Sequence, residues 1–309
     1  MTYWQEYVQP RTVDAALRAL QQARGQARLV AGGTDLLLDL QQGRHPPVRR
    51  LVDITSIDEM LQIRIDGEHA EIGAAVPHRE IVDHPVLADR AACLTRACSL
   101  IGGPQVRNVA TLGGNVAHAL PAGDGTIALV ALDAQAEIAS RAGRRLLPIE
   151  ALFSGPGQTT FDRTAEVLVG FRFRLTGSGE ASAFERIMRP QGVAIAILNL
   201  ACWLRVDASG IVTAARIGVG PAGPRPFRAH QAEAALVGRR IDSGAIDEAG
   251  RALLDEAALR TSAHRATLEY RRHLIATLLR RTVVPAYEAA VHTMARPTDR
   301  QDQVVKVQV

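Results

Sequence analysis

The chain has 309 residues, of which 47% are hydrophobic, 22% charged and 4% aromatic. These values are close to globular averages, so they exclude collagen, coiled-coil and wholly disordered chains, and the length is sufficient for one large or two ordinary domains. The formal net charge of +4 comes from 36 basic and 32 acidic residues, a balance that does not favour nucleic-acid binding.

The opening of the chain is predicted to be a compact mixed α/β unit. Thr12 is a suitable N-cap for the first helix, and Gly43 is a suitable end for the second. The predicted elements, in chain order, are a helix at 12–22, a strand at 28–31, a helix after 35, a strand at 51–54 and a hairpin over 61–72.

The middle of the chain continues with helical periodicity over 86–101, an apolar segment at 127–132 and strand patterns at 136–140 and 166–174. A small polar cluster at 176–180 is the clearest linker signal.

Beyond that linker, strands are expected at 193–206 and 211–219, followed by helices at 229–236, 246–259 and 267–281. Strands followed by helices, without regular alternation, indicate an α+β domain. After about Arg296 a polar tail is expected.

The cysteine count and the chain start bear on the cellular compartment. Cys93, Cys98 and Cys202 are odd in number and form no CxxC motif, which favours buried free thiols in a reducing compartment. The first residues lack the apolar stretch of a signal peptide, and the most apolar run, 193–204, is too short to span a bilayer. The sequence therefore predicts a cytoplasmic protein without a membrane span.

Several chemical motifs are missing or incomplete. The sequence has no GxxxxGK[ST] phosphate loop, no HExxH and no GxSxG, and its nine histidines lack metal-ligand spacing. Residues 218–223 match GxGxxG, but Pro221 and the prolines that follow would interrupt the helix that a dinucleotide site requires. We interpret this match as a turn at the end of a strand. No catalytic acid, base, nucleophile or metal site is predicted.

A first glycine pair is better placed, because Gly32, Gly33 and Thr34 lie between a predicted strand and a predicted helix. Glycines permit positive φ and the close approach of a ligand, and successive amide groups beside a helix start can bind an anion. The alternative is a tight turn in which Thr34 caps the helix.

A second glycine pair lies in the sequence Thr111-Leu-Gly-Gly-Asn115, and Asp124 follows it. Asn115 could donate to a phosphate oxygen, and Asp124 could accept from ribose hydroxyls. The alternative is a structural turn in which Asp124 caps the helix through Leu129. Together, the two distant loops favour one clamp for the pyrophosphate of a nucleotide.

Two segments carry a resemblance to a known family. LVAGGTDLL at 29–37 and VRNVATLGGNVAHALPAGD at 106–124 resemble the FAD-binding signatures of the medium, flavoprotein subunit of molybdenum hydroxylases. This family includes xanthine dehydrogenase and carbon monoxide dehydrogenase. The segments at 215–236 and 268–281 are similar to the family's C-terminal domain and last helix, so the resemblance covers nearly the whole chain.

The resemblance implies an α+β fold with two parts. The first is a two-subdomain FAD-binding domain of the vanillyl-alcohol-oxidase (PCMH) type at 1–176, with subdomains at about 1–57 and 58–176. The second is a smaller α+β C-terminal domain at 177–288, with an antiparallel sheet and helices. A tail at 289–309 would complete the chain.

The resemblance also implies a set of cofactor-binding residues. The first loop would hold the pyrophosphate from one side and the second loop from the other, with Asp124 on the ribose side and Leu168 near the flavin or adenine. The implied FAD-binding residues are Leu29, Val30, Ala31, Gly32, Gly33, Thr34, Asp35, Thr111, Gly113, Gly114, Asn115, Asp124 and Leu168.

The sequence departs from the family pattern at three points. Leu120 occupies a position where many relatives have serine. Arg189 is not followed by the usual Asp, so no residue of this stretch is assigned to the flavin ring. Three scattered cysteines cannot supply the four-cysteine iron–sulfur insertion found in some relatives.

The function implied is electron transfer. FAD in this chain would receive electrons from [2Fe–2S] clusters of a small partner subunit, after a molybdenum–pterin cofactor in a large partner subunit has hydroxylated the substrate, and would pass them to an external acceptor. The expected assembly is a dimer of heterotrimers. Two alternatives remain: a stand-alone FAD oxidoreductase of the same fold, and a bridging subunit without a redox role.

Overall fold

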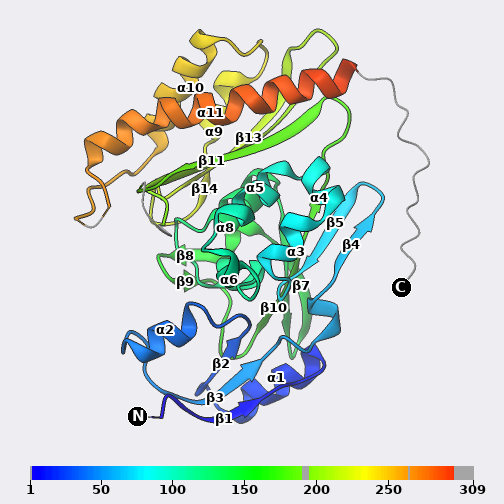
Figure 1. The fold of residues 1–309 in the computed structure, drawn as a ribbon, viewed down its shortest axis with the longest axis vertical. Coiled ribbons are helices and arrows are strands. Elements are labelled where there is room, and N and C mark those ends of the chain that lie inside the picture. The colour runs from blue at the N-terminus through cyan, green and yellow to red at the C-terminus, as the bar shows by residue number, and fades with distance from the viewer. Residues whose placement is uncertain (1, 190–194, 264, 296–309) are drawn as a thin grey trace.

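The computed structural model describes residues 2–189, 195–263 and 265–295 (Figure 1). The three larger sheets succeed one another along the molecule, and helices pack between them and against them. The order of sheets and helices confirms the predicted α+β class.

The first subdomain is built on a three-stranded parallel sheet in the order β1-β3-β2. Thr12 caps the first helix as predicted, because its Oγ1 accepts a hydrogen bond of 3.1 Å from the amide of Ala15. The elements are β1 (Trp4–Val8), α1 (Val13–Gln22), β2 (Ala27–Val30), α2 (Leu36–Gln41) and β3 (Val48–Asp53).

The second subdomain has a five-stranded sheet in the order β4-β5-β10-β6-β7. The predicted helix at 86–101 is two helices, α4 and α5, with a break at Ala91, whose φ of −147° is not helical. The strands are β4 (Ile63–Asp66), β5 (His69–Gly73), β6 (Gln135–Ser140), β7 (Gly143–Pro148) and β10 (Val167–Arg174), with a small hairpin of β8 (Phe153–Gly155) and β9 (Gln158–Thr159).

The helices of this subdomain form one large core with the five-stranded sheet. They are α3 (His78–Asp83), α4 (Pro85–Arg90), α5 (Ala92–Leu100), α6 (Pro104–Arg107), α7 (Leu112–Ala117) and α8 (Asp124–Ala131), with short 3₁₀ turns at η1 (Asp58–Met60) and η2 (Ile149–Leu152).

The C-terminal domain is a four-stranded antiparallel sheet in the order β11-β12-β13-β14, covered on one face by the long helix α11 (Figure 1). Its elements are β11 (Glu180–Ile187), β12 (Leu198–Val206), β13 (Val212–Gly220), β14 (Phe227–Arg228), α9 (His230–Leu236), α10 (Ser243–Glu256) and α11 (Leu268–Ala295). The interpretation of 218–223 as a strand-ending turn is confirmed, because β13 ends at Gly220.

Several boundaries differ from the sequence prediction, two of them by five residues or more, and strand β11 was not predicted. Helix α11 continues through Pro285 to Ala295, into the range expected to be a tail, because its buried face continues to Ala290. Strand β12 begins at Leu198, later than the predicted start. Residues 296–309, where a polar tail was expected, lie outside the described residues.

Helix α8 lies where the two domains meet. It packs against α5 and α7 on one side and against β12 and β13 on the other. The large core accordingly includes Phe184, Ala201 and Trp203 of the C-terminal domain. Among the described residues, no helix is long and apolar enough to cross a membrane.

Candidate functional site

The first glycine loop leaves β2 at the carboxyl end of the parallel sheet, where ligands of α/β sheets commonly bind. Gly33 has a φ of +69°, a conformation that favours glycine. A Cβ atom on Gly32 would lie 1.9 Å from the carbonyl oxygen of Val109. The first loop therefore packs backbone to backbone against the segment that leads into the second loop.

The amide groups of the first loop are available to a ligand. Within the described chain, the N–H groups of Gly32, Gly33, Thr34 and Asp35 donate no hydrogen bond. Thr34 is only partly buried, and its hydroxyl does not cap α2, which excludes the capping alternative for this residue. Successive free amide groups of this kind form a concave site for an anion.

The second glycine loop forms the start of α7. Thr111 is buried and is the N-cap, because its Oγ1 accepts from the amide of Gly114 at 3.0 Å. A Cβ atom on Gly113 would lie 2.5 Å from both Cβ and O of Ala74, so this glycine is required by the fold. Gly114 is exposed, and its Cβ would approach only Thr111 Oγ1, at 3.2 Å. The open side of Gly114 is therefore the side on which a ligand can lie.

Asn115 joins the second loop to α8. Its Oδ1 accepts from the backbone amide of Thr126 at 3.1 Å and from the Thr126 hydroxyl at 3.3 Å. Its Nδ2 has no partner among the described residues, so this group can donate to a ligand. Asn115 thus has one end fixed by protein and the other end free, which suits a phosphate contact.

Asp124 lies in the first turn of α8 with only 4% of its surface exposed. Arg186 of β11 donates to one of its carboxylate oxygens, and Asn199 Nδ2 of β12 donates to the other at 2.6 Å. Burial raises the pKa of Asp124 above its ordinary value, while the Arg186 charge and the Asn199 hydrogen bond act in the opposite direction. The N-cap of α8 is Gly123, so the capping alternative does not hold for Asp124. Its contact with a ribose stays a prediction.

Arg186 and Asn199 are two residues that sequence reasoning did not select. The Arg186 guanidinium also donates to the carbonyl of Leu100 at 2.6 Å, and its Nε has no partner, as is true of Asn199 Oδ1. Buried polar atoms without partners are rare in proteins and call for an explanation such as an absent ligand. The available signal was the position of Arg186, three residues before Arg189, where the sequence departs from the family pattern.

The other predicted residues lie in strands next to the two loops. Leu29 and Val30 belong to β2, which delivers the first loop. Leu168 is buried in β10, and its neighbour Val169 accepts a 2.8 Å hydrogen bond from the amide of Ala74, the residue that contacts Gly113. The structure therefore brings both loops and Leu168 into one region, and their contacts with a cofactor stay a prediction.

A second network that sequence reasoning missed lies at the end of β3, beside the first loop. Asp53 is buried, and its backbone pairs with Val30 in the parallel ladder. Its carboxylate accepts from the Tyr7 hydroxyl, from Gln9 and from Thr55. The bond to Asp53 is the main reason that the pKa of Tyr7 rises to about 12. This network fixes the ends of β1 and β3 next to the point where the first loop begins.

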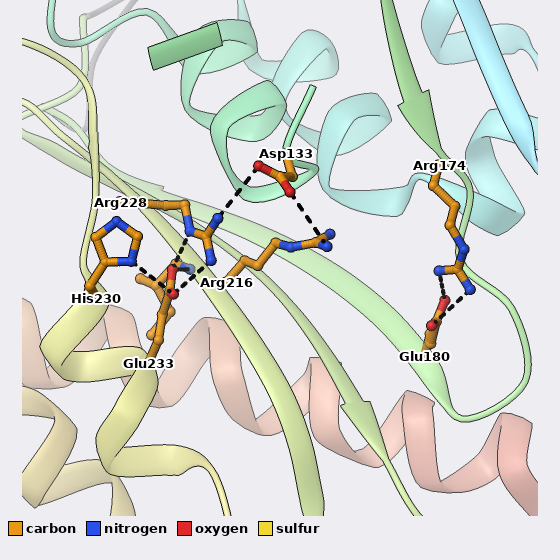
Figure 2. A network of polar contacts seen from close by, with 8 residues as sticks. Asp133, Arg174, Glu180, Arg216, Arg228, His230 and Glu233 are labelled. Atoms are coloured by element: carbon orange, nitrogen blue, oxygen red, sulfur yellow. Dashed lines mark hydrogen bonds and ion pairs between the residues drawn. The ribbon is translucent and has the colours of Figure 1, made fainter. Parts of the chain in front are cut away.

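The far end of α8 is also held by the C-terminal domain. Figure 2 shows Asp133, which follows α8, between Arg216 and Arg228, at 3.6 and 3.5 Å. Arg228 also makes a bidentate pair with the buried carboxylate of Glu233, at 2.8 and 2.9 Å. On the other side of the same view, Arg174 pairs with Glu180 across the predicted linker.

Taken together, the site consists of two glycine loops that touch, free amides on one and an open glycine on the other, and a buried Asp–Arg–Asn cluster at the boundary of the two domains. Within the described residues, no group of histidine, cysteine or acidic side chains could hold a metal ion. Such an arrangement defines a protein that binds a phosphorylated cofactor, and it contains no acid–base or nucleophilic constellation.

Comparison with known families identifies this class more closely. Residues 3–173 match the FAD binding domain in molybdopterin dehydrogenase, and residues 182–286 match the CO dehydrogenase flavoprotein C-terminal domain. The chain is 32% identical over 269 residues to a xanthine dehydrogenase FAD-binding subunit of Escherichia coli, which covers 86% of this chain and 90% of that relative. It is 30% identical over 250 residues to the carbon monoxide dehydrogenase medium chain of Hydrogenophaga pseudoflava, covering 81% of this chain and 85% of the relative.

Comparison with solved structures supports the same family assignment. Carbon monoxide dehydrogenase from Hydrogenophaga pseudoflava superposes with a TM-score of 0.87 at 29% identity, over 94% of this chain and 99% of that one. Quinoline 2-oxidoreductase from Pseudomonas putida gives a TM-score of 0.85 at 26% identity, over 93% of this chain and 98% of that one.

The chain belongs to the family of FAD-binding flavoprotein subunits of molybdenum hydroxylases. It is the flavoprotein subunit of an oxidoreductase, and FAD is its cofactor. The resemblance seen in the sequence is thereby confirmed.

Proposed function

We propose that this chain transfers electrons from the iron–sulfur clusters of a small partner subunit, through its FAD, to an external acceptor. The substrate would be oxidised at a molybdenum–pterin cofactor in a large partner subunit. In this proposal the three subunits form a heterotrimer, two heterotrimers pair, and the complex is cytoplasmic. The relatives named as medium chains support membership of a complex of this kind.

The cofactor-binding part of this proposal rests on the contact between the two glycine loops. Gly32 packs against the backbone of Val109, close in sequence to the second loop; the first loop has four amides without a partner among the described residues, and Gly114 is open on one side. These groups fit a pyrophosphate, which takes hydrogen bonds from amides without requiring a side-chain cation. FAD supplies the redox chemistry when bound, and the protein supplies its position and surroundings.

We further propose that Arg186 and Asn199 belong to this site. They hold Asp124 from the C-terminal domain, and each retains one buried atom without a partner. The charge of Arg186 is balanced by Asp124, so the pair would act by holding the cofactor-binding surface in place across the domain boundary. Flavin content measured for Arg186→Gln should therefore be lower than that of the wild type.

The first experiment is a visible absorption spectrum of the purified full chain, with the released cofactor identified after heat denaturation. We expect a flavin spectrum and about one FAD per chain. A colourless chain that also fails to take up added FAD would contradict the cofactor site and favour the bridging role.

A second measurement separates electron transfer from direct oxidation of a substrate. The FAD-loaded chain is mixed anaerobically with its reduced small subunit, and the flavin absorbance is followed. Bleaching only in the presence of the partner supports the proposal. Bleaching by a small alcohol or amine alone would instead support a stand-alone oxidoreductase.

A further inference from the structure

Arg271 is a buried cation that has no counter-ion. It lies in the first turn of α11, is 3% exposed, and donates from one guanidinium nitrogen to the carbonyls of Ile197 and Pro221. Its Nε has no partner, and among the described residues no carboxylate pairs with it. Residues 190–194, which precede Ile197 closely in sequence, include no Asp or Glu.

Such an arrangement is energetically unfavourable unless an anion completes it. Burying a charge without a partner costs several kcal/mol, and carbonyl oxygens offset only part of this cost. Arg186, the other buried arginine near the domain boundary, does have a carboxylate partner in Asp124. The contrast indicates that the partner of Arg271 comes from outside the described chain.

Two further arginines surround the same place. The segment before α11 folds back on itself through a bridge between Ser262 and Ala266, and Thr261 Oγ1 accepts from the amide of Leu268 at 3.0 Å. These contacts hold Thr261 and Ala266, the chain neighbours of exposed Arg260 and half-buried Arg265, close to the start of α11. Their charges act on Arg271, since both lower its pKa in addition to the larger effect of burial.

The positive charges of Arg260, Arg265 and Arg271 are uncompensated as a group. Within the part of the chain that the structure describes, neither Arg260 nor Arg265 forms an ion pair or a side-chain hydrogen bond. Three guanidinium groups that repel one another, one of them buried, favour a ligand with at least two negative charges. Arginine binds phosphate oxygens through paired N–H donors, so a phosphate group suits this cluster better than a single carboxylate.

The place of the cluster relates it to the cofactor site. Asn199, which holds Asp124, is two residues after Ile197 and pairs with Gly220, the residue before Pro221. Arg271 therefore holds the same ends of β12 and β13 that contribute to the cofactor site, while the loops that bind the pyrophosphate of FAD belong to the other domain.

We infer that Arg260, Arg265 and Arg271 form a second anion site, separate from the FAD clamp, for the phosphate or diphosphate group of a soluble ligand. This site goes beyond the proposed electron transfer and does not depend on it. A bound anion would neutralise the cluster and fix the first turn of α11 against β12 and β13.

The test is isothermal titration of the FAD-loaded full chain with inorganic pyrophosphate at low ionic strength. We expect saturable binding to the wild type and binding at least about tenfold weaker for Arg260→Gln/Arg265→Gln, because two charge-assisted contacts are lost. Arg18→Gln/Arg251→Gln, which removes the same charge from exposed positions of α1 and α10, should bind like the wild type. Both double variants avoid Arg271, whose replacement is expected to affect folding.

Three outcomes are informative. Competition of NAD⁺ with pyrophosphate identifies a dinucleotide as the source of the phosphate, and the absence of competition identifies a free phosphate or diphosphate ion. No saturable binding by the wild type, or equal weakening in both double variants, would overturn the site and leave an acidic partner surface as the counter-ion. Flavin content is measured in every sample, so loss of this site is distinguished from loss of FAD.

Discussion

Gly114 is the position in the two loops at which the predicted ligand site can be tested by substitution. Gly32 and Gly113 cannot accept a Cβ atom because protein backbone occupies its place, whereas Gly114 faces open space apart from its own cap. A substitution at Gly32 or Gly113 should therefore disturb the fold. A substitution at Gly114 should affect ligand binding and leave the fold intact.

We therefore expect Gly114→Val to lose FAD while the chain stays folded. The side chain would enter the space that the pyrophosphate needs, weakening FAD by about fivefold to 150-fold, the equivalent of a typical steric clash of about 1–3 kcal/mol. Flavin content and a thermal melt of the apo-protein are the measurements. Gly244→Val is a matched control, because Gly244 is an exposed glycine in the first turn of α10. Full flavin content in Gly114→Val would exclude the two-loop clamp.

His78 is a residue at which stability should depend on pH. It is 1% exposed behind the second loop, its Nδ1 has no partner, and burial, followed by the charge of Arg107, lowers its pKa to about 4. Between the ordinary pKa of histidine, about 6.5, and this lowered value, the unfolded chain binds a proton that the folded chain does not. Stability should therefore fall as pH falls through this window, by up to about 3 kcal/mol, and should be unaffected above it.

The check is urea unfolding of the wild type, His78→Leu and His292→Leu at pH 7.5 and pH 4.5. His78→Leu should lose less stability on acidification than the wild type, because the titrating group is gone. His292 is exposed on α11, so its replacement should leave the pH dependence unchanged. An equal loss in His78→Leu and the wild type would show that His78 does not titrate as its burial predicts.

At the scale of elements, α8 joins the two domains through charges at both ends. Asp124 at its start binds Arg186 and Asn199, and Asp133 after its end faces Arg216 and Arg228. Asp133 has a φ of +55°, a conformation that costs energy for residues other than glycine but that Asp and Asn adopt more readily than most. An aspartate at this position can adopt the positive φ and also place its carboxylate near two cationic side chains.

The buried pair at the start of α8 gives a prediction for stability. Asp124→Ala should lower the free energy of unfolding by about 3–5 kcal/mol, because it leaves Arg186 buried without its partner. The double variant Asp124→Ala/Arg186→Met should recover a large part of this loss, since the uncompensated charge is removed. In protein that remains folded, Asp124→Ala should also weaken FAD by about 1–3 kcal/mol if Asp124 contacts the ribose.

Denaturant unfolding of the wild type, both single variants and the double variant gives the coupling directly. Additive losses in this cycle would show that Asp124 and Arg186 do not stabilise one another. Unchanged FAD affinity in Asp124→Ala would remove the ribose contact and leave this residue a role at the domain boundary only.

The sequence predicted local features better than contacts between distant segments. The Thr12 cap, the hairpin over 61–72 and the turn after β13 depend on neighbouring residues, and each is present. The break at Ala91 was not predicted, because apolar spacing continues across it. The partnership of Asp124 with Arg186 was also not predicted, since it depends on how β11 packs on α8, and a single strand pattern does not determine that packing.

At the scale of the whole molecule, the three cysteines lie close to the domain boundary, two on α5 and one on β12, and all are free and buried. Burial raises the pKa of Cys93 to about 12 and raises the pKa values of Cys98 and Cys202 as well. Thiols that are both protonated and inaccessible do not react as nucleophiles.

We expect no reaction of a thiol reagent with the native protein and reaction of all three cysteines after denaturation in urea. The rate of labelling in intermediate urea should follow global unfolding, because reagent access requires the cores of both domains to open. Rapid labelling of Cys202 or Cys93 in native buffer would show instead that the two domains separate without unfolding.

The attachment of α8 at both ends has a consequence for building chimeras between family members. A hybrid that joins residues 1–176 of this chain to another member's C-terminal domain must receive a cation opposite buried Asp124, the position that Arg186 fills here. Asp133 has 52% of its side chain exposed, so the loss of Arg216 and Arg228 opposite it should cost less. A donor domain with a neutral residue opposite Asp124 would leave this buried carboxylate without its cation, and the hybrid would be destabilised even if its fold matched closely. Exchange of the C-terminal domain of this chain therefore requires a matched charge opposite Asp124.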